Sequence, residues 1–269
     1  MTKSVKKFYT GYAPKEWKRL VEDPYHKLEF DTTLHFLKKH LPKKGLILDA
    51  GGGPGRYTIE LAKQGYNIVL LDLTPANLEI AKKKIKKEKL QNKVKEVVKG
   101  SIVDLSRFPK NTFDAVICLG GPLSHVIDKK KRDKAISELT RVAKKDAPIF
   151  VSVMSRLSVL KTAINLFPQE IELPRFKKYR DTGDYVGGYG FTACHFFLPE
   201  ELKDSFKKKV KVLELVGLEG VGSNFQKKVN ELAKNKKRWK AWLETHYKTC
   251  THPSIAGTSE HMLIICKKL

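Results

Sequence analysis

The sequence predicts an α/β fold: a doubly wound, mostly parallel, seven-stranded sheet with an antiparallel C-terminal edge strand. From Gly45 onward, short apolar runs alternate with amphipathic helical segments, a pattern typical of a parallel sheet covered by helices on both faces. A glycine cluster follows the first apolar run, as it does at the strand-to-helix turns of such folds. Near the C-terminus, two more strand-like runs are separated only by a helical excursion, which suits an antiparallel pair at the sheet edge.

The parallel part consists of continuous apolar runs, the pattern of strands that are buried on both faces. Strands are expected at 46–50, 67–72, 94–99, 113–119 and 148–154. The segments between them repeat apolar residues at helical spacing or stop at a glycine, as the first one does at Gly65. Helices are expected at 57–64, 75–89 and 132–142.

Three parts of the chain lie outside this alternation of strands and helices. Residues 1–44 are expected to form a helical lid segment that carries several aromatic side chains. The core at 45–154 is followed by an insertion at 155–198, where a helix at 159–167 precedes prolines and a Gly/Tyr-rich stretch. Residues 199–269 return to the sheet, with helices expected at 199–209 and 224–246 and strands at 210–216 and 261–266.

The charge is strongly basic, with 53 Lys and Arg against 29 Asp and Glu and a formal net charge of +24. Such an excess can mark a nucleic-acid or acidic-lipid partner. Only nine of these residues are Arg, the residue preferred for bidentate phosphate and base contacts. The Lys runs have helical spacing, which also fits solvated helix faces or a Lys-rich proteome. The charge therefore leaves a nucleic-acid partner open.

The bulk composition fits one large domain, or one core with a smaller lobe, since 41% of the 269 residues are hydrophobic. No apolar run approaches the roughly 20 residues that cross a bilayer, and no apolar stretch follows the basic N-terminus, so no membrane span or secretory signal is expected. The cysteines lie far apart without zinc-site spacing, which predicts buried, reduced thiols, a cytoplasmic location and no metal site. They are Cys118, Cys194, Cys250 and Cys266.

The strongest motif lies where the first strand meets the first helix. Asp49 ends the strand, and Gly51, Gly53 and Gly55 follow in a G-x-G-x-G pattern. Glycines allow a sharp turn and a close approach of a ligand to the backbone. The helix that begins there directs free N–H groups toward whatever binds.

Two acidic residues indicate which ligand this turn binds. A carboxylate at Asp49 disfavours a pyrophosphate but attracts an ammonium group, and the glycine spacing differs from the G-x-G-x-x-G of dinucleotide sites. Asp72 ends the next strand, 23 residues later, where a carboxylate can accept both hydroxyls of a ribose. Asp72 alone would fit a nicotinamide cofactor equally well. Each acid also has a structural alternative: Asp49 as a turn or capping residue, and Asp72 as a cap for the loop at Thr74.

With these motifs, residues 47–84 and 99–126 resemble the class I, Rossmann-like superfamily of S-adenosylmethionine-dependent methyltransferases, and in particular its small-molecule methyltransferases. The resemblance is strong over residues 45–155 and loose elsewhere. It implies S-adenosylmethionine as cofactor. The resemblance places its aminoacyl end at Asp49, Gly51, Gly53 and Gly55, and its ribose at Asp72. It places the adenine between Leu73 and Ile102, and the sulfonium beside Leu119 and Gly120. Many relatives place an acid for the adenine amino group where this chain has Ser101. Ser101, a backbone group and Asp104 are the candidates for that role.

Methyl transfer is an in-line displacement, so the protein mainly has to align the reacting atoms in a dry pocket. The pocket is expected beyond the carboxyl ends of the strands, with the N-terminal aromatics and the 155–198 insertion as its roof. His125 is the candidate base or acceptor contact, and Arg56 either reaches the cofactor carboxylate or covers the sheet edge. Further candidates for the pocket are Tyr9, Tyr12, Gly121, Ser124, Tyr189 and His195.

The sequence therefore predicts a methyltransferase that acts on a small-molecule acceptor. An RNA (tRNA or rRNA) or protein methyltransferase is the alternative that the basic charge supports. Against it, the loop after the fourth strand lacks the N/D-P-P-Y/F sequence used on exocyclic base nitrogens. A non-catalytic S-adenosylmethionine-binding protein is the further alternative.

Overall fold

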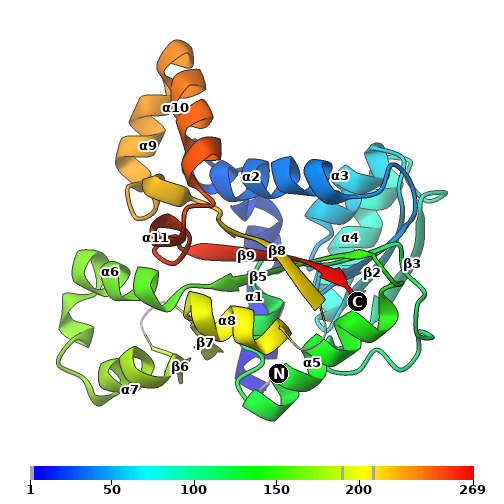
Figure 1. Ribbon diagram of the computed structural model, residues 1–269, viewed down its shortest axis with the longest axis horizontal. Helices are drawn as coiled ribbons and strands as arrows, with labels where there is room; N and C mark the ends of the chain where they lie inside the picture. Colours follow the sequence, from blue (N-terminus) through cyan, green and yellow to red (C-terminus); the bar gives the residue numbers. More distant parts are fainter. Residues whose placement is uncertain (1–2, 189–190, 208–209) are drawn as a thin grey trace.

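The structure, a computed structural model, describes the backbone of residues 3–188, 191–207 and 210–269 and their side chains from Thr10 onward. Within these residues a central sheet of seven strands has the order β3-β2-β1-β4-β5-β9-β8 (Figure 1). Its strands are β1 (Leu46–Ala50), β2 (Asn67–Asp72), β3 (Val94–Lys99), β4 (Ala115–Cys118), β5 (Pro148–Met154), β8 (Val210–Gly217) and β9 (His261–Lys268).

The strand pairing confirms the expected fold class. β1 runs parallel to both β2 and β4, and β3 and β5 extend the parallel part on either side. β9 is antiparallel to β5 and to β8, so the last strand lies one position in from the edge that β8 forms. The carboxyl ends of the parallel strands meet at one edge of the sheet, where open α/β folds bind their ligands.

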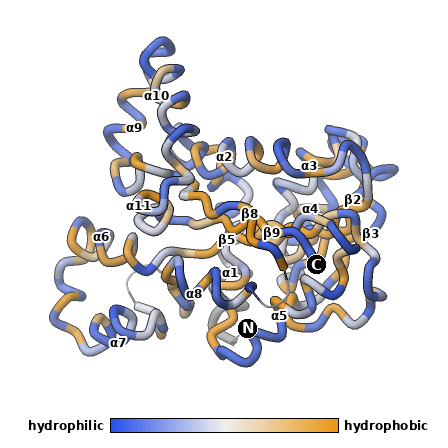
Figure 2. The backbone as a smooth tube through the Cα atoms, in the orientation of Figure 1, coloured by the Kyte–Doolittle hydropathy of each residue, from blue (hydrophilic) through white to orange (hydrophobic). Residues whose placement is uncertain are grey.

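Helices cover both faces of the sheet, which is why its strands are apolar throughout. On one face Ile47 packs in a core with α2 (Pro24–His40), α3 (Arg56–Lys63) and α4 (Pro75–Lys87). On the other face Leu48 packs in a core with α5 (Lys129–Val142) and α8 (Pro199–Phe206). Figure 2 shows hydrophobic residues along the central strands and hydrophilic residues on the outer turns of α5 and α10.

Two helical excursions extend from the same side of the molecule (Figure 1). The first follows β5 and packs around its own cluster, which contains Tyr179 and Phe196. It comprises α6 (Arg156–Leu166), η2 (Pro168–Glu170), α7 (Pro174–Thr182), β6 (Asp184–Tyr185) and β7 (Cys194–His195). The second joins β8 to β9 and comprises η3 (Gly220–Gly222), α9 (Gln226–Ala233), α10 (Lys236–Thr249) and α11 (Pro253–Ala256).

The single helix expected at 224–246 is wrong, because the chain forms two helices there. The side chain of Asn235 accepts a hydrogen bond from the Arg238 N–H and so starts α10 as a separate helix. The N-terminal segment is helical as expected, with α1 (Lys3–Arg19) preceding α2. All four cysteines are buried and free. Across the described part of the chain, no helix is both long and apolar enough to cross a membrane.

Candidate functional site

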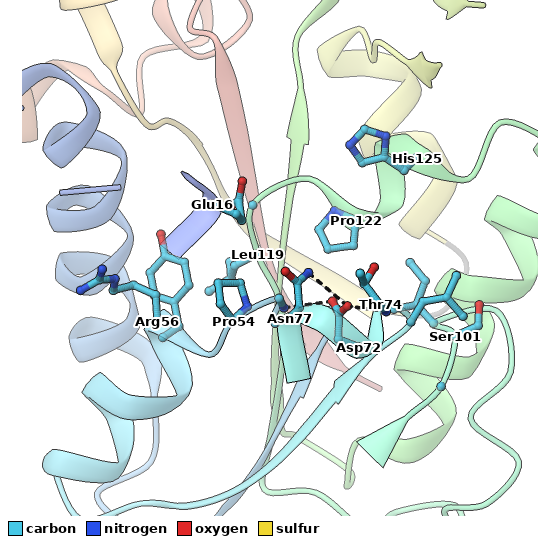
Figure 3. Close-up of a pocket in the computed structure, with 18 of the residues that line it drawn as sticks. Glu16, Pro54, Arg56, Asp72, Thr74, Asn77, Ser101, Leu119, Pro122 and His125 are labelled. Atoms are coloured by element: carbon cyan, nitrogen blue, oxygen red, sulfur yellow. Dashed lines mark hydrogen bonds between the residues drawn. The ribbon is translucent and has the colours of Figure 1, made fainter. Parts of the chain in front are cut away.

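A cleft opens at the carboxyl edge of the sheet, beside the ends of β1, β2 and β4. Figure 3 shows Asp72, Thr74 and Asn77 on its floor, with Glu16 and His125 on the opposite side of the same cleft. The residues that line it come from the glycine turn, the ends of β2 and β4, the loop after β3 and helix α1. The expected ligand edge of the sheet therefore does carry a cleft.

The glycine turn holds the backbone in conformations that favour glycine. Gly51, Gly53 and Gly55 have φ angles of +82°, +56° and +83°. A Cβ on Gly51 would lie 2.7 Å from Pro122, and one on Gly52 would lie 2.4 Å from the Asp49 carboxylate. Gly51 and Gly53 line the cleft, whereas Gly55 is the N-cap of α3, and a Cβ on it would lie 3.3 Å from Ala81. The sequence did not single out Gly52, because its requirement comes from the packing of Asp49.

Asp49 lies directly behind this turn and does not line the cleft. Its side chain is fully buried, and Thr58 Oγ1 donates a hydrogen bond to Oδ2 at 2.6 Å. Its Oδ1 has no partner among the described residues. Burial, together with the nearby Asp72 charge, raises the pKa of Asp49 to about 7. An unsatisfied carboxylate at this position attracts a cation placed on the far side of the glycines.

Asp72 forms the floor of the cleft. Oδ2 accepts a hydrogen bond from the Gly53 N–H at 3.0 Å, and Oδ1 accepts from the Thr74 N–H at 2.8 Å and from Asn77 Nδ2 at 3.3 Å. These contacts fix the position of the carboxylate. Asn77 uses only its Nδ2 in them, and its buried Oδ1 has no hydrogen-bond partner among the described residues. Asn77 was not predicted as a site residue. Its position in the first turn of α4, just after the end of β2, could have indicated it.

The next wall of the cleft contains Leu73, which follows β2, and Ser101 and Ile102, which follow β3. Ser101 forms an isolated bridge with Asp104, and its Oγ accepts a hydrogen bond from the Val103 N–H at 3.2 Å. Asp104 itself is exposed, lies outside the lining and accepts from the Ser106 N–H. Of the two side chains considered for the adenine amino group, only Ser101 faces the cleft.

The loop after β4 separates the predicted residues into two groups. Leu119, Gly120 and His125 line the cleft, but Gly121 and Ser124 do not. Ser124 is fully buried, and its Oγ accepts a hydrogen bond from the Met154 N–H at 3.0 Å, so it ties η1 (Pro122–His125) to the end of β5.

His125 is 3% exposed, and its Nδ1 lies 3.3 Å from the Ala193 carbonyl oxygen. That oxygen can only accept, so Nδ1 carries the proton and Nε2 is the basic nitrogen. Burial lowers the pKa of His125 to about 4, which keeps the ring neutral near pH 7.

Helix α1 closes the cleft from the side. Glu16, Arg19 and Leu20 line it. The Arg56 guanidinium stacks 3.8 Å from the centre of the Trp17 ring and donates a hydrogen bond to the Trp17 carbonyl oxygen. Arg56 therefore lines the cleft and also anchors the helix above it.

A larger cavity of about 830 Å³ adjoins the cleft. Glu16, Arg19, Gly120 and His125 line both spaces. Among its walls are α1, α2, α6, the side chains of Tyr185, Phe191 and Phe196, and the start of β9. Its aromatic lining residues are Tyr12, Tyr25, Phe167, Tyr179, Tyr185, Phe191, Phe196 and Phe225, and its acidic ones are Glu16, Glu29, Glu170, Glu219 and Glu260.

Of the remaining predicted pocket residues, Tyr12 lines the larger cavity. His195 lines neither space, because its buried ring lies between two carboxylates: one ring nitrogen is 2.6 Å from Asp184 and the other is 2.6 Å from Glu201. The Tyr9 side chain and the whole of Tyr189 lie outside the described residues. None of the five acidic cavity residues was predicted, because they come from separate elements and share no local motif.

Comparisons with known proteins point to methyltransferases. A family model described as a methyltransferase domain matches residues 47–146. The chain is 29% identical over 110 residues to a glycine/sarcosine N-methyltransferase of Aphanothece halophytica, covering 41% of this chain and 40% of the relative. It is 30% identical over 132 residues to one of Parasynechococcus marenigrum, covering 48% and 44%. The matches thus span less than half the length of these curated relatives.

Solved structures share the fold at low sequence identity. A crystal structure of an S-adenosylmethionine-dependent methyltransferase from Methanosarcina mazei superposes with a TM-score of 0.61 at 19% identity, covering 87% of this chain and 97% of that one. Because coverage is high and identity is low, this likeness concerns the fold.

Proposed function

We propose that this chain, which belongs to the class I, Rossmann-like superfamily of S-adenosylmethionine-dependent methyltransferases, transfers a methyl group from that cofactor to a small-molecule acceptor. One observation carries the proposal. The glycine turn, with Asp49 behind it and Asp72 beside it, opens through Gly120 and His125 into a second, larger cavity. One chain thus provides a cofactor cleft and a separate acceptor space that meet at a few residues.

The described residues fit the cofactor. The left-handed glycines leave room for a ligand against the backbone, since a side chain at Gly51 would collide with Pro122. Asp72 and the unsatisfied Oδ1 of Asn77 offer acceptors for ribose hydroxyls. The unsatisfied Asp49 Oδ1 supplies negative charge behind the turn, where an ammonium end would bind. Leu73 and Ile102 offer apolar surface for the adenine, with Ser101 beside them.

S-adenosylmethionine supplies an electrophilic methyl group on a sulfonium. The chain's own contribution is to align the acceptor with that methyl group and to exclude water, and positioning of this kind lowers a barrier by about 7–11 kcal/mol. Leu119 and Gly120 border the transfer point, and neutral His125 lines both spaces. His125 Nε2 can accept a proton from an acceptor that keeps one at neutral pH.

A small acceptor fits the cavity better than RNA does. Five carboxylates line the acceptor space, together with Arg19, Lys227 and Lys228, and carboxylates repel a phosphate group that enters the cavity. An 830 Å³ volume lies in the range of pockets that bind small molecules. The curated relatives named above are glycine/sarcosine N-methyltransferases, which agrees with a small acceptor.

The test measures cofactor binding and methyl transfer separately. Calorimetry with S-adenosylhomocysteine should show binding to the unaltered protein and about 10- to 100-fold weaker binding to Asp72→Asn, because charge-assisted hydrogen bonds to the ribose are lost. Asp104→Asn is the matched control, since Asp104 is exposed and off the cleft.

Incubation with methyl-labelled S-adenosylmethionine and fractionated cell extract should then label the small-molecule fraction. A protein that ignores S-adenosylhomocysteine refutes the cofactor site. Binding without labelling of any fraction refutes the transferase activity and supports a non-catalytic cofactor-binding protein. Labelling confined to RNA or protein refutes the small acceptor.

A further inference from the structure

Resting on the proposed function, we propose that the acceptor is a small organic amine that is positively charged in solution and carries no carboxylate. It would bind in the 830 Å³ cavity, with its ammonium group at a cluster of buried and half-buried carboxylates and its apolar body against the aromatic wall. The cluster, called here the acceptor cluster, consists of Glu16, Arg19, Glu29, Glu219, Glu260 and His261.

The acceptor cluster begins at the transfer point and continues away from it through ion pairs. Arg19, which lines both spaces, donates to Glu16 at 3.1 Å and to Glu29 at 2.5 Å. His261 Nδ1 lies 3.7 Å from Glu29 Oε2 and 2.7 Å from Glu219 Oε1. The end of the acceptor cluster formed by Glu16 and Arg19 therefore borders the cofactor cleft.

The acceptor cluster has more negative than positive charge. Arg19 and His261 are its two cationic members, and each is already paired with a carboxylate. Lys227 and Lys228, which are both exposed, line the same cavity outside the acceptor cluster. Although burial alone lowers it, the charges of Glu29 and Glu219 raise the pKa of His261 to about 9, so this imidazole is protonated near pH 7. The charges of Glu260 and Glu219 also attract the ammonium group of Lys161 in α6. Within the described residues, no ion pair joins Lys161 to either carboxylate.

Glu260 is the member of the acceptor cluster that forms no ion pair with any described residue, although the charges of His261 and Lys161 act on it. It accepts hydrogen bonds from the Tyr25 hydroxyl at 2.6 Å and from Asn224 Nδ2 at 3.1 Å, both neutral donors. Burial and the neighbouring Glu219 charge raise its pKa. A bound ammonium group would supply the missing positive charge, in surroundings where charges interact more strongly than in water.

The rest of the cavity suits the body of such a molecule. Tyr12, Tyr179, Tyr185, Phe191 and Phe196 line it, and aromatic faces attract organic cations.

Two other occupants agree less well with these contacts. An acceptor carboxylate at the acceptor cluster would find Arg19 and His261 already paired, and the lysines of the cavity lining, Lys227 and Lys228, are exposed and lie outside the cluster. The oxygen and nitrogen atoms of Glu29, Glu219 and His261 lie within 4.8 Å of one another, as in a metal site. A divalent ion there would have to break the His261–Glu219 contact and lie beside the Arg19 guanidinium.

The reaction balances without any further reactant. The bound ammonium group first loses one proton to Glu260 or to solvent, and the freed nitrogen lone pair forms the new N–C bond while the S–C bond breaks. The electron pair of that bond stays on sulfur, which becomes a neutral thioether. The products are the methylated ammonium ion, S-adenosylhomocysteine and one released proton.

The experiment compares isosteric ligands in the presence of saturating S-adenosylhomocysteine. Calorimetry would use phenylethyl, butyl and imidazolylethyl compounds, each as the amine, the alcohol and the corresponding carboxylic acid, together with glycine. At least one amine should bind about tenfold or more tightly than its alcohol and its acid, because it gains a charge-assisted hydrogen bond. In Glu260→Gln, which keeps an acceptor for Tyr25, this preference should fall by about tenfold. The Glu244→Gln control, on the exposed side of α10, should keep it.

Each opposite result overturns the proposal. These results are no amine bound more tightly than its alcohol, a preference for an acid or for glycine, an unchanged preference in Glu260→Gln, or micromolar binding of Zn²⁺ or Mg²⁺ alone at the acceptor cluster. Absent binding of S-adenosylhomocysteine would instead show that the proposed function has failed, which keeps the two failures distinguishable.

Discussion

At the scale of single residues, the cleft depends on two acids that do different things. Asp72 faces the cleft and is held by three hydrogen bonds from backbone and side-chain N–H groups, so its geometry is fixed before any ligand arrives. Asp49 is hidden behind Gly52 and keeps one oxygen unsatisfied. A buried carboxylate of this kind costs stability, and such a cost is commonly retained where it serves binding.

Replacing Gly51 by Ala should weaken cofactor binding. Its φ of +82° is unfavourable for Ala, and the new Cβ would lie 2.7 Å from Pro122, which lines the cleft. We expect S-adenosylhomocysteine affinity to fall at least about tenfold and the free energy of unfolding to fall by about 1–3 kcal/mol, measured by calorimetry and urea titration. Gly65→Ala is the matched control, because Gly65 also has a positive φ but no atom within 4 Å of the built Cβ. Equal effects of both changes on affinity would show that backbone strain alone is responsible.

Replacing Asp49 by Asn should stabilise the fold while weakening cofactor binding. Burial above all raises the folded-state pKa of Asp49 to about 7, while an unfolded Asp titrates near ~3.9. Between these values the folded chain holds a proton that the unfolded chain has released, so the contribution of Asp49 to stability falls as pH rises from about 4 to about 7.

The Tm of Asp49→Asn minus the Tm of the unaltered protein should therefore increase by about 2 °C or more when the pH is raised from about 5 to about 8, as measured by thermal unfolding. Calorimetry at pH 8 should show weaker binding of S-adenosylhomocysteine. Thr58→Val, which removes only the hydrogen bond to Oδ2, is the comparison variant. An affinity unchanged by Asp49→Asn would remove Asp49 from the cofactor site.

At the scale of elements, the sequence predicts what depends on local pattern. Four strands, 46–50, 67–72, 94–99 and 148–154, have the bounds expected from their apolar runs, because a strand buried on both faces leaves an unbroken hydrophobic signature. The glycine turn and Asp72 could also be predicted from the sequence, since strand, turn and helix follow one another in the chain. The acceptor cavity was not, because its acidic lining comes from α1, α2, η2, the loop before η3 and the start of β9. Only tertiary packing brings these residues together, and each alone is an ordinary Glu.

Helix α1 is the element whose removal should open the cleft. Trp17 lies between the Arg56 guanidinium, 3.8 Å from its ring centre, and the Lys84 ammonium, 4.7 Å from it. We expect Trp17→Ala to expose α1 to limited proteolysis and to weaken S-adenosylhomocysteine binding about tenfold, while Trp17→Phe retains most of both properties. Hydrogen exchange should localise the change to α1 and the cleft. Loss of protection spread over the whole sheet would mean that Trp17 stabilises the core instead.

At the scale of the whole molecule, charge is distributed unevenly between surface and interior. The formal net charge is +24, and its lysines lie largely on outer helix faces such as the start of α5, where Lys129, Lys130 and Lys131 are all exposed. The acceptor space, by contrast, is lined by five glutamates. A positive exterior and a cavity rich in carboxylates favour different partners, and under the proposed function the acceptor binds in the cavity.

Bulk tRNA should accordingly bind only as a nonspecific polyanion. Because binding of this kind releases counterions, its affinity falls steeply with salt, and we expect a gel shift at about 50 mM salt that disappears by about 200 mM. The complex should leave S-adenosylhomocysteine affinity unchanged, since the phosphate backbone stays on the lysine faces and is repelled at the acceptor cavity. Labelled S-adenosylmethionine should transfer no methyl group to the tRNA. Binding that persists at 200 mM salt and is accompanied by labelling of the tRNA would mean that the lysine surface guides a nucleic-acid substrate, and the acidic cavity would then need a different explanation.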